Sequence, residues 1–573
     1  MAEALTRAGR LSARDLARLR GINVTAVHPL VYLAEQHLDD LSRPGKKLDM
    51  DALLHFLADE TGQSAVEIDP LKIDVASVAE VMSKAFAERH RILAVAVSPE
   101  EVTVASAEPL VSNWEHDLGQ VVRRPIRRVI ADPREILRHT QDFYAMADSV
   151  RGAHGIRGLD AGQRLSNLES LVELGARGGE PDANDQHIVS VVDWLLQYAF
   201  EQRASDIHIE PRRKVGKVRL RIDGILHDAY ELPAVVSTAV TSRFKILARL
   251  DVAEKRRPQD GRMKTRTPDG NEVELRLSTM PTAFGEKLVM RIFDPDVLLK
   301  SYAELGLTDH NLERWQSMIE TGTGIVLVTG PTGSGKTTTL YSTLRRLATP
   351  EVNVCTIEDP IEMVEPAFNQ MQVNHNIDLD FATGVRTLMR QDPDVIMVGE
   401  IRDFETAHMA VQAALTGHLV LSTLHTNDSP GAISRLNELG VPAFLIRATV
   451  RGAMSQRLVR RLCTDCKQLE PADPDGWQTM TGGALPMPEQ LFRPVGCKQC
   501  RDTGYRGREG LYEVLVASTD VQETIVDGYS TRDIRHAAIA DGMTPLRLAG
   551  AEKVADGETT IEEVLRVTPA LER

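Results

Sequence analysis

Residues 330–337 limit the possible folds of this chain more than any other segment. Their sequence, GPTGSGKT, matches the phosphate-binding pattern G-x-x-x-x-G-K-[S/T]. An apolar run precedes the segment, and Leu340, Leu344 and Leu347 follow it at helical spacing. A strand, a glycine-rich loop and a helix in this order are the context in which such a loop binds phosphate. The sequence therefore predicts a parallel α/β sheet with a phosphate site at the end of one strand.

Each residue type in this loop has a chemical role in binding phosphate. Glycines let backbone N–H groups converge on phosphate oxygens, and the following helix directs its positive N-terminal end at the anion. Lys336 supplies a cation for the β- and γ-phosphates, and the Thr337 hydroxyl is expected to ligate the Mg²⁺ that accompanies ATP. The predicted nucleotide-binding residues are Gly330, Pro331, Thr332, Gly333, Ser334, Gly335, Lys336, Thr337 and Thr338.

Hydrolysis also requires a positioned water, and acidic residues at strand ends can provide it. A buried-strand run ends at Glu400, which is therefore predicted to lie near the γ-phosphate and to polarise water. Glu358 follows another such run and is expected to position water or Mg²⁺, with a plain Asp-Pro turn as the alternative. His418 and His425 flank a third run, and one of them could sense the γ-phosphate or relay to Glu400. The three runs are residues 352–357, 395–398 and 419–423.

Four of the five cysteines form two C-x-x-C pairs, Cys463 with Cys466 and Cys497 with Cys500. Two chelating pairs of this kind supply four thiolates to a tetrahedral Zn²⁺. A closed four-cysteine site leaves no open position, so we expect the metal to be structural. A redox dithiol and a nucleic-acid-binding ribbon are the alternatives, and the few aromatic residues near the pairs count against the ribbon.

Composition excludes several classes of protein. The chain has 67 Lys and Arg against 82 Asp and Glu, a net charge of −15, so a whole-surface binder of polyanions is not expected. Aromatic residues make up 4%, which argues against a stacking surface for single-stranded nucleic acid. The N-terminus lacks the apolar core of a signal peptide, and no run approaches the roughly 18 apolar residues of a spanning helix. We therefore expect a cytosolic protein that does not bind nucleic acid.

The 573 residues predict several domains, and changes of pattern suggest where they divide. The expected segments are 1–60, helical; 61–150, an α+β module; 151–185, a glycine-rich flexible linker; 186–297, a second N-terminal domain; 298–458, the α/β domain; 459–510, the tetracysteine module; and 511–573, a C-terminal helical domain. The expected elements outside the α/β domain are helices at 78–86, 165–174 and 189–200 and strands at 92–97, 102–104, 218–222, 273–277 and 288–293.

Several longer motifs accompany the phosphate loop. They are SDIHIEP at 205–211, RIDG at 221–224, PQDGR at 258–262, TIEDPIE at 356–362, RQDPD at 390–394, GEIRD at 399–403, TGH at 416–418, TLHTN at 423–427 and GYRGR at 504–508. With these motifs the chain resembles the secretion ATPases of type II secretion and type IV pilus assembly. The resemblance is close over residues 186–573 and looser over residues 61–150.

The resemblance implies a RecA-like P-loop NTPase core preceded by an α+β (PAS-like) domain, with the zinc module as an insertion. It implies a homohexamer in which ATP lies between the RecA-like domain and the smaller domain before it. Arg276 and Arg291 match arginines that such enzymes bring onto the γ-phosphate, where they would neutralise charge in the transition state. Arg386 and Arg390 match a second arginine pair near the catalytic face, and the resemblance implies that they help to bind the nucleotide, acting between domains or subunits.

The same resemblance gives other residues a role. Glu358 falls in the family's Asp box, Glu400 in its Walker B motif, and His418 and His425 in its His box. It further implies a cytoplasmic protein whose N-terminal module docks on platform and cytoplasmic-domain proteins at the inner membrane. The strand before Glu400 lacks the aspartate of an ordinary Walker B motif, so metal ligation would rest on Thr337 and water.

Three functions from different classes fit this pattern. The expected function is that of an ATPase motor, and the sequence of residues 356–362 favours type II secretion over pilus assembly. Retraction motors fit less well, since they typically lack the N-terminal module and the cysteine pairs. A nucleic-acid motor would need a salt-sensitive affinity for DNA. A non-catalytic nucleotide switch is disfavoured by the intact Lys336 and Glu400.

Overall fold

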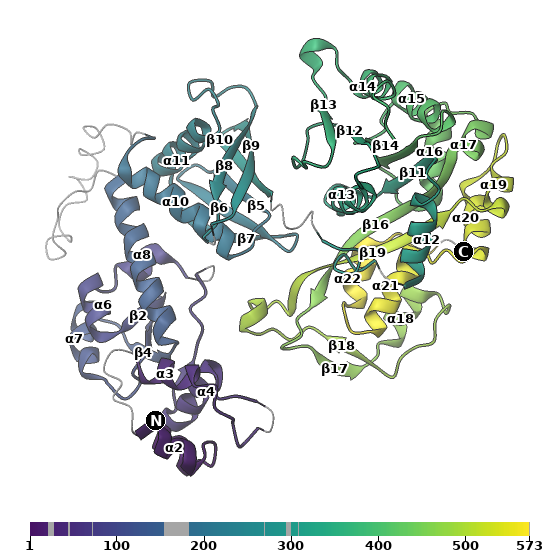
Figure 1. The fold of residues 1–573 in the computed structure, drawn as a ribbon. Coiled ribbons are helices and arrows are strands. Elements are labelled where there is room, and N and C mark those ends of the chain that lie inside the picture. Colours follow the sequence, from purple (N-terminus) through teal and green to yellow (C-terminus); the bar gives the residue numbers. More distant parts are fainter. Residues whose placement is uncertain are drawn as a thin grey trace. The chain divides into compact units, whose positions relative to one another are not determined.

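The computed structural model describes residues 1–20, 28–43, 46–70, 73–153, 183–268, 270–293, 300–307 and 309–571. The chain divides into two compact units, Met1–Ile292 and Phe293–Arg573 (Figure 1). Each unit has its own apolar core. The helix expected at 165–174, with most of the expected linker, lies outside the described residues. Among the described residues, none of the helices combines the length and the apolar character that a bilayer crossing requires.

The helices expected at the N-terminus are present and share a small core. They are α1 (Ala2–Arg7), α2 (Ala13–Arg20), α3 (Pro29–Glu35) and α4 (Met50–Thr61). Leu5, Leu53 and Leu54 lie at the centre of this core. Asp49 caps helix α4: its carboxylate accepts a hydrogen bond from Ala52 N at 2.8 Å and so satisfies an otherwise unpaired N–H of the first turn.

A four-stranded sheet of order β1-β4-β3-β2 follows, with helices around it. Its elements are β1 (Ser64–Ala65), α5 (Val75–Ala79), α6 (Lys84–His90), β2 (Ile92–Val97), β3 (Val102–Ser106), α7 (Asn113–Val122), β4 (Ile126–Ile130) and α8 (Pro133–Ala153). The strands expected at 92–97 and 102–104 are present as β2 and β3, and they pair antiparallel. The prediction of a single helix at 78–86 is wrong, because two helices, α5 and α6, meet in this segment. Ser83 starts the second helix: its hydroxyl accepts a hydrogen bond from Phe86 N.

The rest of the first unit is a six-stranded sheet of order β7-β6-β5-β10-β9-β8. Its elements are α10 (Gln186–Glu201), β5 (Asp206–Pro211), β6 (Val215–Ile222), β7 (Ile225–Pro233), α11 (Ala234–Leu247), β8 (Gln259–Arg266), β9 (Glu272–Thr282) and β10 (Gly285–Phe293). Side chains alternate along each strand. Ile207 and Ile209 enter the core with the helices, whereas Asp206, His208 and Glu210 lie on the other, charged face.

The second unit contains the predicted α/β sheet (Figure 1). Its strand order is β13-β12-β14-β15-β11-β16-β19, and every strand is parallel except β19 (Tyr505–Val516). Its elements are α12 (Asp309–Ile319), β11 (Gly324–Thr329), α13 (Lys336–Leu347), β12 (Val354–Glu358), β13 (Asn369–Gln372), a 3₁₀ turn (His375–Ile377), α14 (Phe381–Leu388), β14 (Val395–Val398), α15 (Phe404–Leu415), β15 (Leu419–Leu424), α16 (Ser429–Glu438), α17 (Ala443–Thr449) and β16 (Val450–Leu462). Along β11, Ile325 and Leu327 join one apolar cluster and Val326 and Val328 the other. Both faces of the sheet are therefore covered, which confirms the α/β class.

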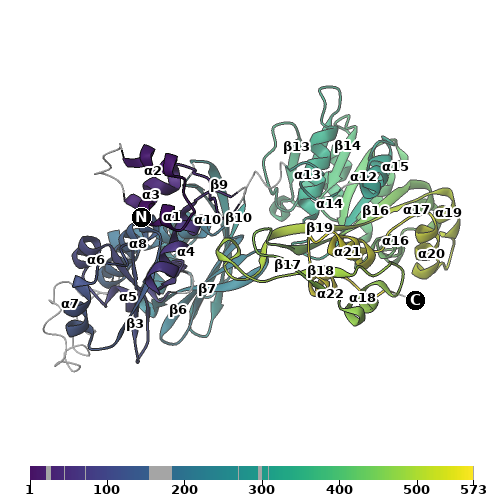
Figure 2. The same cartoon turned by 90° about the horizontal axis from the view of Figure 1, so that it is seen from below.

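The end of the chain departs from the expected helical domain. It consists of β17 (Gln468–Pro471), α18 (Pro474–Thr481), β18 (Gln490–Arg493), a 3₁₀ turn (Lys498–Cys500), β19 (Tyr505–Val516), α19 (Thr519–Thr524), α20 (Thr531–Ala540), α21 (Leu546–Ala555) and α22 (Ile561–Val567). Strands β16 and β19 pair antiparallel and run across both expected limits of the tetracysteine module, 459 and 510. Figure 2 shows α18, α21 and α22 gathered beside β17 and β18.

Candidate functional site

The loop at 330–337 joins β11 to α13 at the carboxyl end of a central strand. Gly330, Gly333 and Gly335 have φ angles of +146°, +79° and +87°, which L side chains rarely adopt. At Gly330 there is no room either: a Cβ would lie 2.5 Å from Gln456 O. Pro331, Thr332 and Gly333 are exposed. The loop therefore presents its backbone at the N-terminus of α13, where an anion is favoured.

Lys336 lies folded back over this loop. Its Nζ donates to Gly330 O at 2.7 Å and to Pro331 O at 3.1 Å. Burial lowers the pKa of Lys336 to about 8, against the opposing charge of Glu400 and with help from that of Arg457. The ammonium is thus held beside the loop by neutral carbonyls, which a phosphate could replace as partner. Thr337 and Thr338 lie in the first turn of α13, and both are partly exposed.

Glu400 follows β14 and lies on the same edge of the sheet as the loop. Its carboxylate pairs with Arg402, and His425 Nε2 lies 3.5 Å from its Oε2. His425 itself follows β15, the strand between β14 and β11. The structure therefore brings Lys336, Glu400 and His425 together, because the carboxyl ends of parallel strands meet at one edge.

Glu358 ends β12 and is engaged inside the protein. Its Oε2 accepts from Tyr341 Oη at 2.7 Å, and its Oε1 accepts from Thr356 Oγ1 at 2.7 Å and from Gln370 Nε2 at 3.2 Å. The side chain is 3% exposed. Burial and the carboxylate of Glu358 raise the pKa of Tyr341, which keeps the tyrosine a donor. In this arrangement Glu358 fixes the position of α13 through Tyr341, and both of its oxygens already accept protein donors.

The structure separates the two histidines. His425 follows the carboxyl end of β15, whereas His418 precedes its amino end, and a strand of six residues spans about 20 Å. His418 Nδ1 lies 2.9 Å from Ala413 O and 3.1 Å from Thr416 Oγ1, at the end of α15. We therefore do not place His418 in the site with the phosphate loop and Glu400.

Arg386 and Arg390 are also away from the loop within this unit. Arg386 lies in the last turn of α14, with its guanidinium 3.9 Å from the Met409 sulfur. Arg390 donates to Arg386 O at 3.0 Å. Both precede β14 and so lie towards the edge where the parallel strands begin, opposite the phosphate loop.

Arg276 and Arg291 belong to the first unit and share the charged face of its six-stranded sheet. Arg276 is on β9 and Arg291 on the neighbouring β10. Arg291 Nε donates to Asp206 Oδ1 at 3.1 Å, and Arg221 Nε lies 3.6 Å from Asp206 Oδ2. Arg276 Nε lies 3.9 Å from a Glu274 oxygen. Asp206 thus orients Arg291, whose side chain is 57% exposed.

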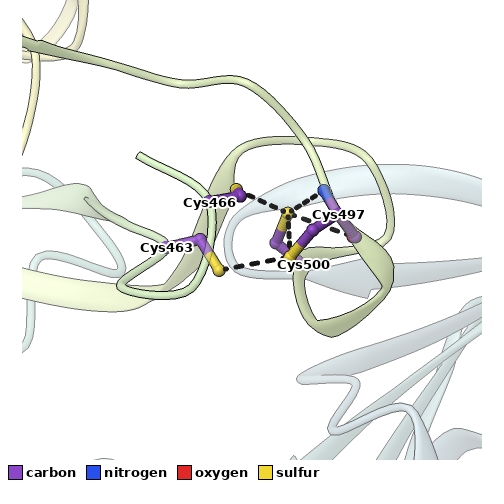
Figure 3. Close-up of side chains that lie close together, drawn as sticks. All are labelled: Cys463, Cys466, Cys497 and Cys500. Carbon is purple, nitrogen blue, oxygen red and sulfur yellow. Dashed lines mark hydrogen bonds between the residues drawn. The ribbon is translucent and has the colours of Figure 1, made fainter. Parts of the chain in front are cut away.

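The four predicted cysteines converge (Figure 3). All four sulfurs lie within 4.8 Å of one another, and the pairs Cys463–Cys497, Cys466–Cys500 and Cys497–Cys500 are each 3.7 Å apart. Four thiolates at the usual Zn–S distance of about 2.3 Å in a tetrahedron would have sulfurs about 3.8 Å apart. The geometry therefore fits one Zn²⁺ with no open position.

Backbone groups around the cluster also favour thiolate. Cys497 N and Gly504 N donate to the Cys500 sulfur at 3.1 and 3.2 Å. Burial opposes ionisation of Cys500, but these donors, together with the thiols of Cys466 and Cys497, outweigh burial and lower the pKa of Cys500. Hydrogen bonds of this kind orient and tune metal-binding thiolates.

Sequence reasoning missed the residues beneath the phosphate loop. Gln456 on β16 accepts from Thr339 Oγ1 at 2.9 Å, and its Nε2 would lie 2.8 Å from a Cβ at Gly335. Arg402 pairs with Glu400, and its position two residues after the acid was the available signal. No comparable local signal marks Gln456, because the pairing of β16 with β11 brings it to the loop.

A phosphate loop and a strand-end glutamate on one edge of this α/β sheet define the protein as a P-loop ATPase. Residues 182–566 match the family model described as "Type II/IV secretion system protein", and residues 61–150 match the MshEN domain. The chain belongs to the type II/IV secretion system protein family. This confirms the resemblance seen in its motifs.

Relatives of this chain are named for two machines, type IV pilus assembly and type II secretion. The type IV pilus assembly ATPase TfpB of Acinetobacter baylyi is 52% identical over 99% of this chain and 97% of its own length. The type II secretion system protein E of Pectobacterium carotovorum subsp. carotovorum is 41% identical over 86% of this chain and 91% of its own length. Because both systems appear, the comparisons do not confirm the expectation of type II secretion.

A solved structure shares the fold. The X-ray structure of the Legionella pneumophila ATPase DotB covers 65% of this chain and 94% of that protein, with a TM-score of 0.50 and 23% identity. This likeness supports the fold alone.

Proposed function

We propose that this chain is a cytoplasmic ATPase motor that drives assembly of a type IV pilus. The observation that carries the proposal is the 52% identity to a pilus assembly ATPase along nearly the whole length of both chains, N-terminal module included. The chain would work as a homohexamer at the inner membrane, where its N-terminal module would dock on platform and cytoplasmic-domain proteins of the machine. This choice departs from the type II secretion favoured by residues 356–362 alone.

The chemistry would be hydrolysis of ATP, with residues of the described site in named roles. The backbone of 330–337 and Lys336 would bind the phosphates, and the Thr337 hydroxyl would hold Mg²⁺, which neutralises phosphate charge. Glu400 would accept a proton from the attacking water. Arg402 and His425 would orient the Glu400 carboxylate, which both of them contact. Glu358 would act indirectly, by holding α13 through Tyr341.

Arginines from outside this edge would complete the site. Arg276 and Arg291 of the first unit would meet the γ-phosphate and stabilise the transition state. Arg386 and Arg390 lie at the opposite edge of their own sheet, so we propose that they serve an interface between subunits. Zn²⁺ on the four cysteines would hold the ends of β16 and β19 together and take no part in hydrolysis.

The test separates turnover from nucleotide binding. Glu400→Gln should lower phosphate release by the purified chain about 100-fold or more, because it removes the proton acceptor. ATP affinity should stay within about threefold, since glutamine keeps the shape and removes a negative charge. Glu405→Gln, an exposed acid on α15, is the matched control. Unchanged turnover in Glu400→Gln would remove Glu400 as the base.

The biological role is tested in a strain that lacks this gene. Wild-type protein should restore surface pili, and the Lys336→Ala variant should not. Type II secretion is the second candidate, favoured by the 41% identity to a type II secretion protein E. Restored export of a secreted enzyme without pili would support that candidate and contradict the first.

A further inference from the structure

Arg457 is a buried cation on β16 that hydrolysis, as described above, does not use. It is 5% exposed. Its guanidinium donates to four neutral oxygens: Asn427 O at 2.7 Å, Gln456 O at 3.0 Å, Val567 O at 3.1 Å and Ser455 Oγ at 3.5 Å. An arginine keeps its charge in a protein, so a full positive charge lies beneath the sheet edge.

Within the described part of the chain, no carboxylate pairs directly with this guanidinium. The acids whose charge reaches it have other partners. Asp428 binds Arg535 at 2.5 Å, and Glu513 accepts from Ser429 N and Leu546 N at 2.7 and 3.1 Å. Arg460 on the same strand shows the usual alternative, an ion pair of 2.7 Å with Glu563. A buried charge without a counter-ion is unfavourable, so an anion is expected close by.

The phosphate loop is where that anion would bind. Arg457 Nη1 lies 3.1 Å from the point where a Cβ would stand on Gly330, the first glycine of the loop. The Ser334 hydroxyl lies 2.7 Å from the same point. Ser334 is 3% exposed, and its hydroxyl has no hydrogen-bond partner among the described residues. A fixed cation and a buried unpaired hydroxyl therefore both lie against Gly330, whose carbonyl accepts a hydrogen bond from Lys336.

We propose that Arg457 is a positioning residue whose fixed charge beneath the phosphate loop strengthens binding of the phosphates of a nucleoside di- or triphosphate. The inference rests on the proposed nucleotide site. The carbonyls of Asn427 and Val567 hold the guanidinium in place, so the loop after β15 and the end of α22 both contribute to the site. Because the charge is present before ligand binds, it needs no reorganisation when phosphate arrives.

The test, made with the full chain, separates the effect of the charge of Arg457 from the effect of its hydrogen bonds. Arg457→Gln removes the charge and keeps two N–H donors, whereas Arg457→Lys keeps the charge and loses most of the four bonds. Arg461→Gln is the matched control, because Arg461 lies on the same strand, is half-exposed and pairs with Glu509 at 3.3 Å. ATP and ADP affinities are measured by titration calorimetry, KM and kcat by phosphate release, and the melting temperature without nucleotide.

We expect Arg457→Gln to lower the affinity for ATP and for ADP about tenfold, because a positive charge near the phosphates is lost. KM should rise with kcat nearly unchanged, since ground state and transition state lose the interaction alike. Arg457→Lys should bind both nucleotides within about threefold of wild type although its melting temperature falls. Arg461→Gln should bind as wild type does.

Equal losses of affinity in the Gln and Lys variants would show a purely structural role and overturn the inference, as would wild-type affinity in Arg457→Gln. If Arg457→Gln does not fold, Arg457→Lys decides alone: a loss above about tenfold overturns the inference, because Lys retains the charge. A wild-type chain that binds neither ATP nor ADP would instead overturn the proposed function.

Discussion

Replacing Glu563 with glutamine should loosen the C-terminal helix α22 from β16. Glu563 is 2% exposed and accepts from Arg460 Nη2 at 2.7 Å, Arg460 N at 3.1 Å and Arg566 Nη2 at 2.8 Å. Burial opposes its charge, but these donors outweigh burial and lower the pKa of Glu563 from 4.5 to about 2. The ionised carboxylate is therefore one of the contacts that fix α22.

This pKa sets the size of the effect. The difference between 4.5 and about 2, at 1.36 kcal/mol for each pKa unit, gives an upper limit of about 3 kcal/mol. Arg566 is half-exposed and solvent screens its share, so we expect about 2 kcal/mol at pH 7. Because the folded pKa lies below the unfolded one, the stabilisation is full above about pH 4.5 and is lost as pH falls towards 2.

Hydrogen exchange measured by mass spectrometry reports this change locally. At pH 7, a loss of 2 kcal/mol corresponds to about 30-fold faster exchange in α22 of Glu563→Gln, with α15 unchanged. Glu562→Gln is the matched control, because Glu562 is exposed on the same helical turn. Wild-type protection of α22 should fall between pH 4.5 and 3, and that of the Gln variant should not.

Equal protection of α22 in Glu563→Gln and wild type at pH 7 would refute this reasoning. Equal losses in Glu563→Gln and Glu562→Gln would do the same, because they would trace the effect to net charge on the helix rather than to the buried contacts.

The remaining predictions concern the loop, the metal and the first unit. Gly330→Ala should lower the affinity for ATP about tenfold or more, as measured by titration calorimetry, because the new Cβ would lie 2.5 Å from Gln456 O and force the loop to move. Cys463→Ser should lose zinc by elemental analysis and lower the melting temperature, because three thiolates leave the metal weakly held. Burial, then the charge of Arg138, lowers the pKa of His139 to about 4. Its folded pKa lies below the ordinary 6.5, so the first unit should lose stability in thermal unfolding as pH falls from 6.5 to 4, and His139→Gln should lose less.

Each of these has a contrary outcome. Normal ATP affinity in Gly330→Ala would show that the loop can accommodate a Cβ at residue 330, which would contradict this reasoning. Wild-type protein purified without zinc, and unaffected by chelators, would contradict the metal site. Identical pH profiles for wild type and His139→Gln would show that another group governs acid sensitivity.

The parts of the site that sequence predicted are those that local pattern determines. The strand, loop and helix around Lys336 are contiguous, so their geometry follows from neighbouring residues. Glu400 and His425 could be placed because both follow strands of one parallel sheet, and such strands end at one edge. The cysteine pairs carry their own spacing rule, and the sulfurs converge as that rule requires.

Other features depend on pairings that local pattern does not show. Gln456 and Arg457 reach the loop only because β16 lies beside β11. Strand β19 was hidden because its apolar run, 511–516, is short and precedes charged helices, and periodicity alone cannot identify such a run. The separation of His418 from His425 could have been foreseen, since residues that flank a strand lie at its opposite ends.

One strand, β16, carries the floor of the nucleotide loop at Gln456 and Arg457 and reaches the first metal ligand, Cys463, about 20 Å further on. Inserting a single residue between Arg457 and Cys463 would turn the cysteine to the wrong side of the sheet or invert the two floor residues. The 30 residues between Cys466 and Cys497 are constrained in a different way: the metal site closes β17, α18 and β18 at both ends, and Trp477, Met480 and Leu491 are buried in one apolar cluster with β16, β19 and the C-terminal helices. Evolution can therefore change the loops between these elements more readily than the span along β16, where the side that each residue faces depends on its length.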